Sequence, residues 1–227
     1  MFVPGQYRQP DDSWPIDLIR LNPLALLISN GAKVGIPFAT HLPIILDPDR
    51  SEDAFELSKI RLFGHMNKAN PHWRALPDQG PVLAAFTGPN AYVSPTVYEK
   101  TPAAPTWNFA AVHVQAALQK LESHEETIAV VKATVRAFET DFGTGWDMSE
   151  SLDYFSRILP GVGAFYLDVQ HVDSMFKFSQ EQSPEIQERV RTSFARHEST
   201  QHRDTATLMC RLARAGAEGN SFTPGGQ

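Results

Sequence analysis

The chain has 227 residues, of which 42% are hydrophobic and 20% charged, and its formal net charge is −6. This composition is typical of a globular protein with a sizeable core and excludes a chain that is disordered throughout. The acidic balance argues against a protein that binds nucleic acid through a broad basic surface and leaves open only a local basic patch.

The single cysteine, Cys210, excludes an intrachain disulfide and a zinc site made from cysteines. Its neighbours Leu208, Met209 and Leu212 predict a buried structural thiol. The N-terminus lacks a basic region followed by an apolar core, and no apolar run is long enough to span a membrane. We therefore expect a cytoplasmic protein.

The first elements in chain order are a helix and a pair of strands. Asp12 or Ser13 can cap a helix that continues to Leu21, with Pro15 in its first turn. The apolar run Leu24–Ser29 predicts a strand, and Asn30-Gly31 is a hairpin turn sequence. The return strand, Gly35–Leu46, contains two prolines, which predict an irregular or edge strand.

A second group of strands and turns follows this hairpin. Asp47–Asp53 is acidic and contains a proline, which indicates a solvated turn. Phe55–Phe63 predicts a strand that ends at a corner at Gly64, and Pro81–Thr87 predicts a buried strand that ends at Gly88-Pro89-Asn90.

The remaining elements alternate between strands and capped helices. Thr106–Leu121 and Gly163–Gln180 predict long strands. Ser123-His124-Glu125-Glu126 is a capping box that opens a helix ending near Gly143. Further helices are expected from Ser149 to Pro160, from Ser183 to about His197, and from there to Gly216, with a frayed tail from Ala217.

The predicted elements sum to five or six strands with peripheral helices and without regular βαβ alternation. This pattern favours a mainly β (α+β) fold, an antiparallel barrel with added helices. We expect a barrel domain with inserted helices over residues 1–182 and a C-terminal helical extension with a flexible tail over residues 183–227.

The stretch LFGHMNKANPHW, Leu62–Trp73, is the main candidate for a ligand site. An apolar approach meets Gly64, and the polar residues His65, Asn67, Lys68 and Asn70 follow before a short helix that opens at Pro71. A strand-to-helix corner with free main-chain N–H groups and a lysine suits a phosphate. A plain loop has the same composition, so this reading needs support from the rest of the chain.

Other chemistries find less support in the sequence. The histidine pairs His65/His72 and His197/His202 lack the spacing and the nearby carboxylate of a helical metal site. No Gly-x-Ser-x-Gly elbow is present, so nucleophilic hydrolysis is unsupported. Tyr92, Tyr98 and His41 can each serve as a proton donor or have a purely structural role.

Five short motifs occur in a fixed order, and Tyr98 follows the third. They are THLPII (Thr40–Ile45), GHMNKANPHW (Gly64–Trp73), GPNAYVSP (Gly88–Pro95), PTWNF (Pro105–Phe109) and KFSQ (Lys177–Gln180). Together they resemble the PaiB family of FMN-binding negative transcriptional regulators, from Met1 to about Ser183. The resemblance implies an FMN-binding split β-barrel that forms a homodimer, with the flavin at the subunit interface.

The resemblance also implies which residues hold the flavin. Thr40, His41, Leu42 and Pro43 would run beside the isoalloxazine ring. The corner, with Gly64, His65, Asn67, Lys68 and Asn70, would meet the ribityl phosphate. Lys177, Ser179 and Gln180 would close the site from a later strand.

Three positions depart from the family pattern, and each lies in or beside the implied site. Asn67 stands where the family has a small alanine, Val97 where it has tryptophan, and Glu181 where it has asparagine. The scaffold and a nucleotide-like ligand are therefore safer expectations than unchanged chemistry. An altered FMN pocket and a site adapted to another substrate both stay open.

Two functions follow as hypotheses. The first is a flavin-dependent oxidoreductase that acts on a small molecule. The second is a PaiB-like transcriptional regulator that binds FMN without catalysis, and a haem-binding or repurposed split-barrel enzyme is a weaker third. For DNA binding, the segment 184–216 carries six arginines and four acidic residues and shows no helix-turn-helix pattern, so a solvated helical surface or a dimer contact is favoured over a recognition helix.

Overall fold

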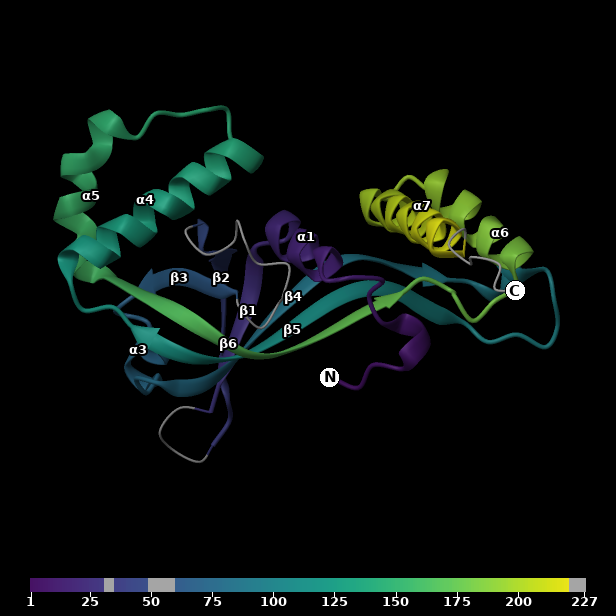
Figure 1. Cartoon of the computed structure of the whole chain (residues 1–227), viewed down its shortest axis with the longest axis horizontal. Helices are drawn as coiled ribbons and strands as arrows, with labels where there is room; N and C mark the ends of the chain where they lie inside the picture. The colour runs from purple at the N-terminus through teal and green to yellow at the C-terminus, as the bar shows by residue number, and fades with distance from the viewer. Residues whose placement is uncertain (31–34, 49–59, 221–227) are drawn as a thin grey trace, which may run out of the picture. The chain divides into compact units, whose positions relative to one another are not determined.

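Six strands form a closed barrel in the computed structural model, which describes residues 1–30, 35–48 and 60–220, with side chains as far as Ala215 (Figure 1). Around the barrel the order is β1-β2-β3-β6-β5-β4. The strands are β1 (Leu24–Ser29), β2 (Phe38–Leu46), β3 (Arg61–Asn67), β4 (Gly80–Val93), β5 (Thr106–Lys120) and β6 (Val162–Lys177). This fold is a split antiparallel β-barrel with added helices, which confirms the expected fold class.

The helices precede, interrupt and follow the barrel strands. They are α1 (Ser13–Leu21), α3 (Pro71–Ala75), α4 (His124–Asp141), α5 (Leu152–Ile158), α6 (Pro184–Ala195) and α7 (Thr200–Asn220). Four short 3-10 segments are η1 (Gly5–Tyr7), η3 (Pro95–Tyr98), η4 (Ser149–Ser151) and η5 (Leu159–Gly161). Over the described ranges, no helix is both long and apolar enough to cross a lipid bilayer.

The chain divides into two compact units. The barrel unit comprises residues 16–86 and 112–172, of which those given above are described. The helical unit comprises residues 1–15, 87–111 and 173–227, described as far as residue 220. Strands β4, β5 and β6 each run from one unit into the other. The expected domain boundary between residues 182 and 183 stays a prediction.

In the barrel unit, α4 covers an outer face of the sheet beside β3. Phe63 and Ala164 from the strands pack with Val130 of α4 in one buried cluster. The predicted capping box starts this helix: Glu126 N–H donates to Ser123 Oγ at 3.1 Å, and Ser123 Oγ donates to the Glu126 carboxylate at 2.7 Å. The local sequence thus determines where α4 begins, and the apolar side of α4 packs the helix against the sheet.

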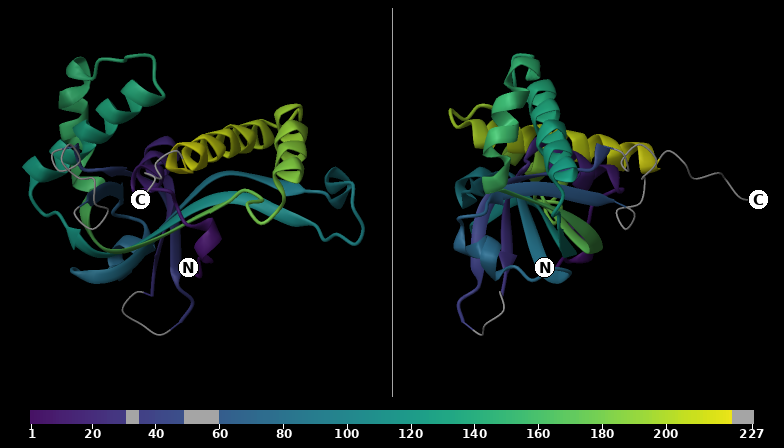
Figure 2. Two further views of the ribbon diagram at one scale, coloured as in Figure 1. Left: turned by 45° about the vertical axis from the view of Figure 1, so that its right-hand side comes forward. Right: turned by 90° about the vertical axis from the view of Figure 1, so that its left-hand side faces the viewer.

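In the helical unit, α6 and α7 pack against each other on one side of the strand ends (Figure 2). Ile186, Val190 and Phe194 form the buried side of α6. Trp14 meets Phe176 of β6 edge-on, with ring centroids 5.2 Å apart. Both helices were expected, and α7 continues to Asn220, beyond the expected end at Gly216, while the frayed tail stays a prediction.

Three sequence-based expectations need correction. Asp47 is not part of a solvated turn, because it is 3% exposed and bound by Arg61 through Nε at 2.7 Å and Nη2 at 2.5 Å. Strand β3 does not stop at Gly64 but continues to Asn67. Strand β4 runs without a break through Gly88-Pro89-Asn90. Residues 49–59, and with them most of the predicted acidic turn and the start of the predicted third strand, lie outside the described residues.

His72 links three elements of the barrel unit. Its ring is 1% exposed, with Nε2 3.0 Å from Ser29 Oγ of β1 and Nδ1 2.8 Å from Thr40 Oγ1 of β2. The ring also stacks on Phe38, with centroids 5.3 Å apart and 17° between the planes. A neutral imidazole has one donor and one acceptor, so one hydroxyl donates to the ring and the other accepts from it. Helix α3 is thereby joined to the β1–β2 pair.

Replacement of His72 by alanine should lower the free energy of unfolding by about 3 kcal/mol, because it leaves a cavity and two hydroxyl groups without their partner. Urea unfolding followed by circular dichroism measures this loss. The matched control is His41→Ala, which removes an exposed histidine from β2 and should leave stability nearly unchanged. A loss for His72→Ala as small as that of the control would contradict the linking role.

Stability should also fall in mild acid because of His72. Burial lowers the pKa of its imidazole, so the folded state resists protonation that the unfolded chain accepts. The His72 contribution is therefore intact above the unfolded pKa of about 6.5 and is lost as the pH falls toward the folded pKa, by on the order of 1 kcal/mol for the first pH unit. Urea unfolding at about pH 7.5 and 5.5 should show a smaller pH effect in His72→Gln than in the unmodified protein. His65 and His202 are shifted in the same direction and supply the dependence that remains in that variant.

Candidate functional site

Strands β2 and β3 separate in the barrel unit after a short paired stretch. Their antiparallel register joins Leu46 to Leu62, Ile45 to Phe63 and Ile44 to Gly64, and ends there. Beyond this point, residues 38–43 of β2 pair with β1, whereas residues 65–67 of β3 pair with β6. All of these residues are described, so the barrel wall opens between the two strands over this length. The expectation that β2 behaves in part as an edge strand is confirmed.

Pro43 and Gly64 lie at the point where the strands part. A Cβ atom on Gly64 would lie 2.9 Å from the Pro43 carbonyl oxygen and 3.0 Å from the Phe165 ring, so only glycine permits this close approach. Pro43 has no N–H to offer to β3, and the ladder ends beside it. Of the other residues expected beside the flavin, His41 is exposed, Thr40 is half-buried, and Leu42 is buried at 4% exposure.

The corner after β3 is held by its own asparagines. Asn67 Oδ1 accepts from Ala69 N–H at 2.8 Å, and Asn70 N–H donates to the Asn67 carbonyl oxygen at 2.9 Å. Asn70 Oδ1 then accepts from His72 N–H at 2.9 Å and so caps α3. The sequence reading assumed free main-chain donors at the start of this helix, but Asn70 binds two of them, because the Trp73 N–H also donates to its carbonyl oxygen at 3.0 Å. A helix of five residues also has little dipole to offer to a phosphate.

Two basic side chains at the corner, those of Lys68 and His65, have polar atoms without a hydrogen-bond partner in the described part of the chain. Lys68 is exposed, and no partner for its ammonium group exists among the described residues, while its main-chain N–H donates to the Gly161 carbonyl oxygen at 2.8 Å. His65 Nδ1 is buried and has no hydrogen-bond partner in the described part of the chain. Burial lowers the pKa of the His65 imidazole, which favours its neutral form near pH 7.

The three residues expected to close the site belong to the helical unit. Lys177 Nζ donates to Thr106 Oγ1 at 2.5 Å. Ser179 is fully buried with a φ of +66°, and its hydroxyl exchanges hydrogen bonds with the Asn108 amide at 3.0 and 3.2 Å. The Gln180 amide accepts from Phe178 N–H and donates to the Phe176 carbonyl oxygen, both at 2.5 Å. Ser179 and Gln180 therefore shape the end of β6, and Lys177 retains donors for a ligand.

Sequence reasoning named His72 and Tyr98 but did not predict how deeply they are buried. His72 was considered only as a weak metal ligand, and no periodic pattern shows that it meets residues 32 and 43 positions earlier. Tyr98 is 2% exposed, and its hydroxyl has no partner within the described chain. Burial raises the Tyr98 pKa, and the nearby Glu181 and Tyr7 raise it further. In the described residues no group of three or more histidine, cysteine or acidic side chains could hold a metal ion.

Comparison with known proteins places this chain in a family. The family model described as "Putative FMN-binding domain" matches residues 1–171. The chain is 26% identical over 212 residues to the protease synthase and sporulation protein PAI 2 of Bacillus subtilis (strain 168), covering 92% of this chain and 96% of that protein.

Solved structures share the fold at low identity. An FAD and haem binding protein from Mycobacterium smegmatis has a TM-score of 0.53 at 15% identity, over 74% of this chain and 72% of that one. A conserved hypothetical protein from Mycobacterium tuberculosis has a TM-score of 0.55 at 10% identity, over 81% and 94% of the two chains. With the sequence match above, the order of motifs from Thr40 to Gln180 and the split barrel agree on one assignment: the chain belongs to the PaiB family of FMN-binding domains, and FMN is its cofactor.

Proposed function

We propose that this protein is an FMN-dependent oxidoreductase that transfers electrons or hydride between the flavin and a small molecule. The observation that carries the proposal is the open edge of β2 over residues 38–43, beside a corner whose Lys68 has no ion-pair partner among the described residues. When bound, FMN supplies the redox chemistry, and the protein has to bind it, orient it and exclude water from it. The residues of the barrel unit suit those tasks.

The open edge of β2 fits the polar side of a flavin ring. Along an antiparallel strand, alternate residues direct their N–H and C=O groups to opposite sides. Because residues 38–43 use one side to pair with β1, the other side is available over this stretch. The pyrimidine end of an isoalloxazine carries hydrogen-bond acceptors and a donor. The free N–H and C=O groups of a strand edge can bind both kinds of group. Thr40, His41, Leu42 and Pro43 would thus line the ring.

The corner fits the phosphate through side chains rather than through helix α3. Lys68 supplies a free cation, and His65 Nδ1 supplies a buried polar atom that lacks a partner within the described chain. Gly64, Asn67 and Asn70 would act indirectly, since Gly64 permits the close strand approach and the two asparagines fix the turn that carries Lys68. Lys177, Ser179 and Gln180 belong to the helical unit, and their expected role at the flavin stays a prediction.

A homodimer with the flavin at the subunit interface belongs to the same proposal. Two large apolar side chains are exposed at the two ends of the β1–β2 pair: Ile36, just before β2, is 93% exposed, and Leu24, at the start of β1 and paired with Pro43, is 62% exposed. Large apolar side chains exposed on a strand pair suit a surface that another protein covers. A second subunit would also exclude water from a flavin bound there.

A regulator that binds DNA through its C-terminal helices is less well supported. Four of the six arginines between residues 184 and 216 are used within the protein. Arg189 donates to the Tyr98 carbonyl oxygen, Arg191 pairs with Glu188, Arg203 donates to the Glu198 carbonyl oxygen, and Arg211 lies 4.4 Å from the centre of the Trp14 ring. Since these guanidinium groups already have partners, few are left for DNA phosphates.

Lys68→Ala should weaken FMN binding by about 1.5–3 kcal/mol, because one charge-assisted contact to the phosphate is lost. Quenching of flavin fluorescence during titration with the purified protein measures the dissociation constant. Arg157→Ala, which removes an exposed cation from α5 in the same unit, is the matched control and should bind FMN normally. Equal affinities for the two variants would show that the corner has only a structural role.

The oxidoreductase proposal predicts turnover that depends on the bound flavin. With NADH or NADPH as donor and menadione as acceptor, the FMN-loaded protein should exceed free FMN at equal concentration by about tenfold or more, since it holds donor and flavin together. Stopped-flow absorbance follows reduction and reoxidation of the flavin. A protein that binds FMN, gives no rate above free flavin with any donor and shifts promoter DNA in a salt-dependent manner would instead be a regulator.

A further inference from the structure

A cavity lies within the helical unit. It has a volume of about 510 Å³ and is bounded by the N-terminal arm (residues 1–10), the end of β6 and helices α6 and α7. Phe178, Met209 and Leu212 form an apolar wall, and Arg8 and Arg191 contribute charge. The lining also includes the polar side chains of Gln6, Gln180, Gln187 and Glu188. This volume, with an apolar wall and polar groups that can fix the orientation of a ligand, is usual for a small-molecule site. The proposed FMN site uses neither arginine.

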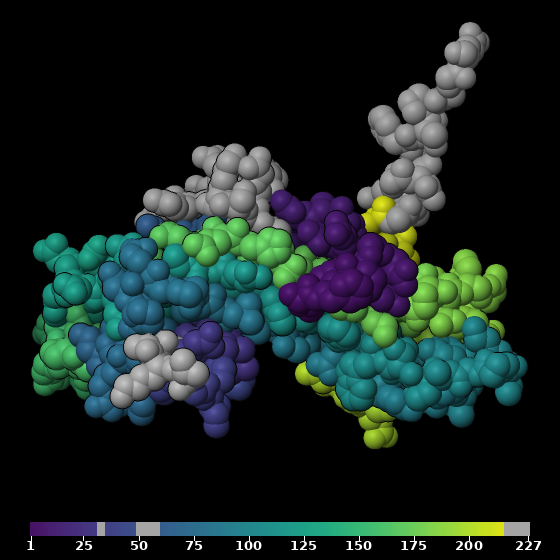
Figure 3. All heavy atoms as spheres, turned by 90° about the horizontal axis from the view of Figure 1, so that it is seen from below, coloured from purple at the N-terminus to yellow at the C-terminus, as the bar shows by residue number. Residues whose placement is uncertain are grey.

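Arg8 is positioned by the residues on either side of it. Tyr7 donates from its hydroxyl to Glu181 at 3.1 Å, and Gln9 accepts from Ser174 Oγ of β6 at 2.7 Å. Figure 3 shows the arm, in purple, lying against the C-terminal helices, in green and yellow. Arg8 is exposed, and within the described chain its guanidinium has no hydrogen-bonded or ionic partner. The arm thus holds an uncompensated cation at the cavity wall.

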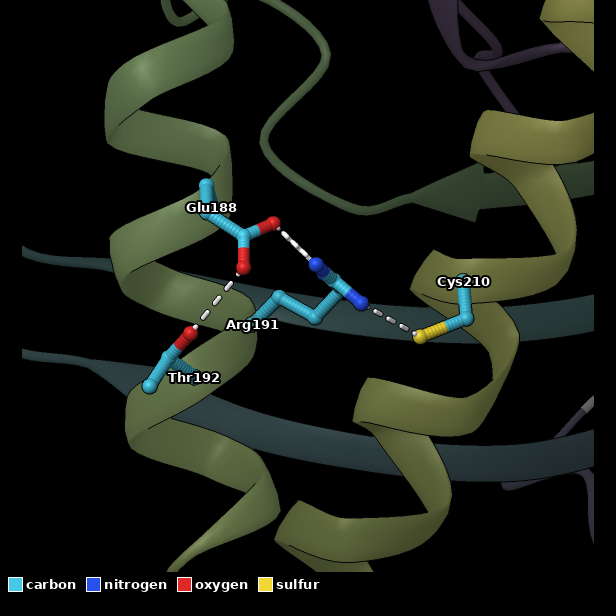
Figure 4. Close-up of polar contacts among 4 residues, drawn as sticks. All are labelled: Glu188, Arg191, Thr192 and Cys210. Carbon is cyan, nitrogen blue, oxygen red and sulfur yellow. Dashed lines mark hydrogen bonds and ion pairs between the residues drawn. The ribbon is translucent and has the colours of Figure 1, made fainter.

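Arg191 faces the same cavity from α6 with part of its binding capacity unused. Its Nε donates to the Glu188 carboxylate at 2.9 Å, its Nη2 pairs with the same carboxylate, and its Nη1 donates to Cys210 Sγ at 3.1 Å (Figure 4). Thr192 Oγ1 donates to the other oxygen of that carboxylate at 3.2 Å. A guanidinium group has five N–H donors, so two remain on Arg191. These contacts hold the guanidinium in place and leave two of its N–H groups available for a ligand.

The charges of the cavity select an anion. Glu188 is the carboxylate of the lining and is neutralised by Arg191, which leaves the charge of Arg8 uncompensated. Gln180 is also in the lining, but its amide is already bound to main-chain groups on both sides. The walls therefore present one net positive charge in a protein of net charge −6. A ligand that pairs a single negative charge with an apolar body matches this arrangement.

We infer that this cavity binds a small carboxylic acid with an apolar body, with the carboxylate between Arg8 and Arg191 and the body against Phe178, Met209 and Leu212. The inference rests on the helical unit alone and does not depend on the proposed oxidoreductase function. Glu181, which departs from the family pattern, contributes indirectly, because it anchors Tyr7 and thereby the arm that carries Arg8. The proposed acid site thus depends on residues particular to this chain and not on the bound flavin.

Isothermal titration of the full-length protein with octanoate tests the inference. We expect saturable binding of one octanoate per chain and no binding of 1-octanol, which has the same body without the charge. Arg8→Gln should weaken octanoate binding about tenfold, since it removes a charge-assisted contact. Arg214→Gln, an exposed arginine of α7 outside this cavity, is the matched control and should bind octanoate like the unmodified protein.

A cavity-filling variant gives an independent readout. Ala213→Trp adds a large side chain at an exposed position of α7 that lines the cavity, so octanoate binding should disappear while the thermal midpoint and FMN affinity are kept. Absence of saturable octanoate binding, equal binding of 1-octanol, or an unchanged affinity in Arg8→Gln would each overturn the inference. FMN binding is measured on the same samples, so an unmodified protein that binds FMN but shows no saturable octanoate binding rejects this site and leaves the proposed function intact.

Discussion

The contact between His72 and the two hydroxyl groups of Ser29 and Thr40 governs the geometry of the barrel unit. It holds helix α3 against the β1–β2 pair at the place where β2 no longer has β3 as a neighbour. This link therefore helps to fix the position of the open edge of β2 relative to the corner that follows β3. A buried, neutral imidazole with both nitrogens bound is a rigid connector, because any movement of one strand breaks a hydrogen bond in a water-free site.

Much of the fold was accessible from local sequence, because its determinants lie within a few residues of each other. The capping box at Ser123 defines the start of α4, Pro184 that of α6, and the apolar run Leu24–Ser29 defines β1. The failures share a cause. Strand β4 continues through Gly88-Pro89-Asn90, a typical turn sequence, because pairing with neighbouring strands outweighs local preference. Asp47 is buried because Arg61, 14 residues later, pairs with it.

The candidate site was predictable as a location but not as a set of contacts. The motif order gave the strand and the corner, yet nothing in the sequence distinguishes an asparagine that binds a ligand from one that closes a turn. Asn67 and Asn70 both bind main-chain N–H groups of their own corner. The two asparagines would therefore contribute to a phosphate site by holding Lys68 in position and not by binding the phosphate themselves.

Two of the three departures from the family pattern have local explanations in the structure, and nothing in it explains the valine at position 97. The Asn67 amide oxygen is bound to Ala69 N–H. The Val97 main-chain carbonyl oxygen accepts from Arg189, a contact that needs no particular side chain at that position. Glu181 anchors the N-terminal arm through Tyr7. None of these contacts removes Lys68 or closes the open edge of β2, so the substitutions are compatible with an ordinary FMN site. What they change is the surroundings: Glu181 holds the arm, and the arm brings Arg8 to a separate cavity between the C-terminal helices.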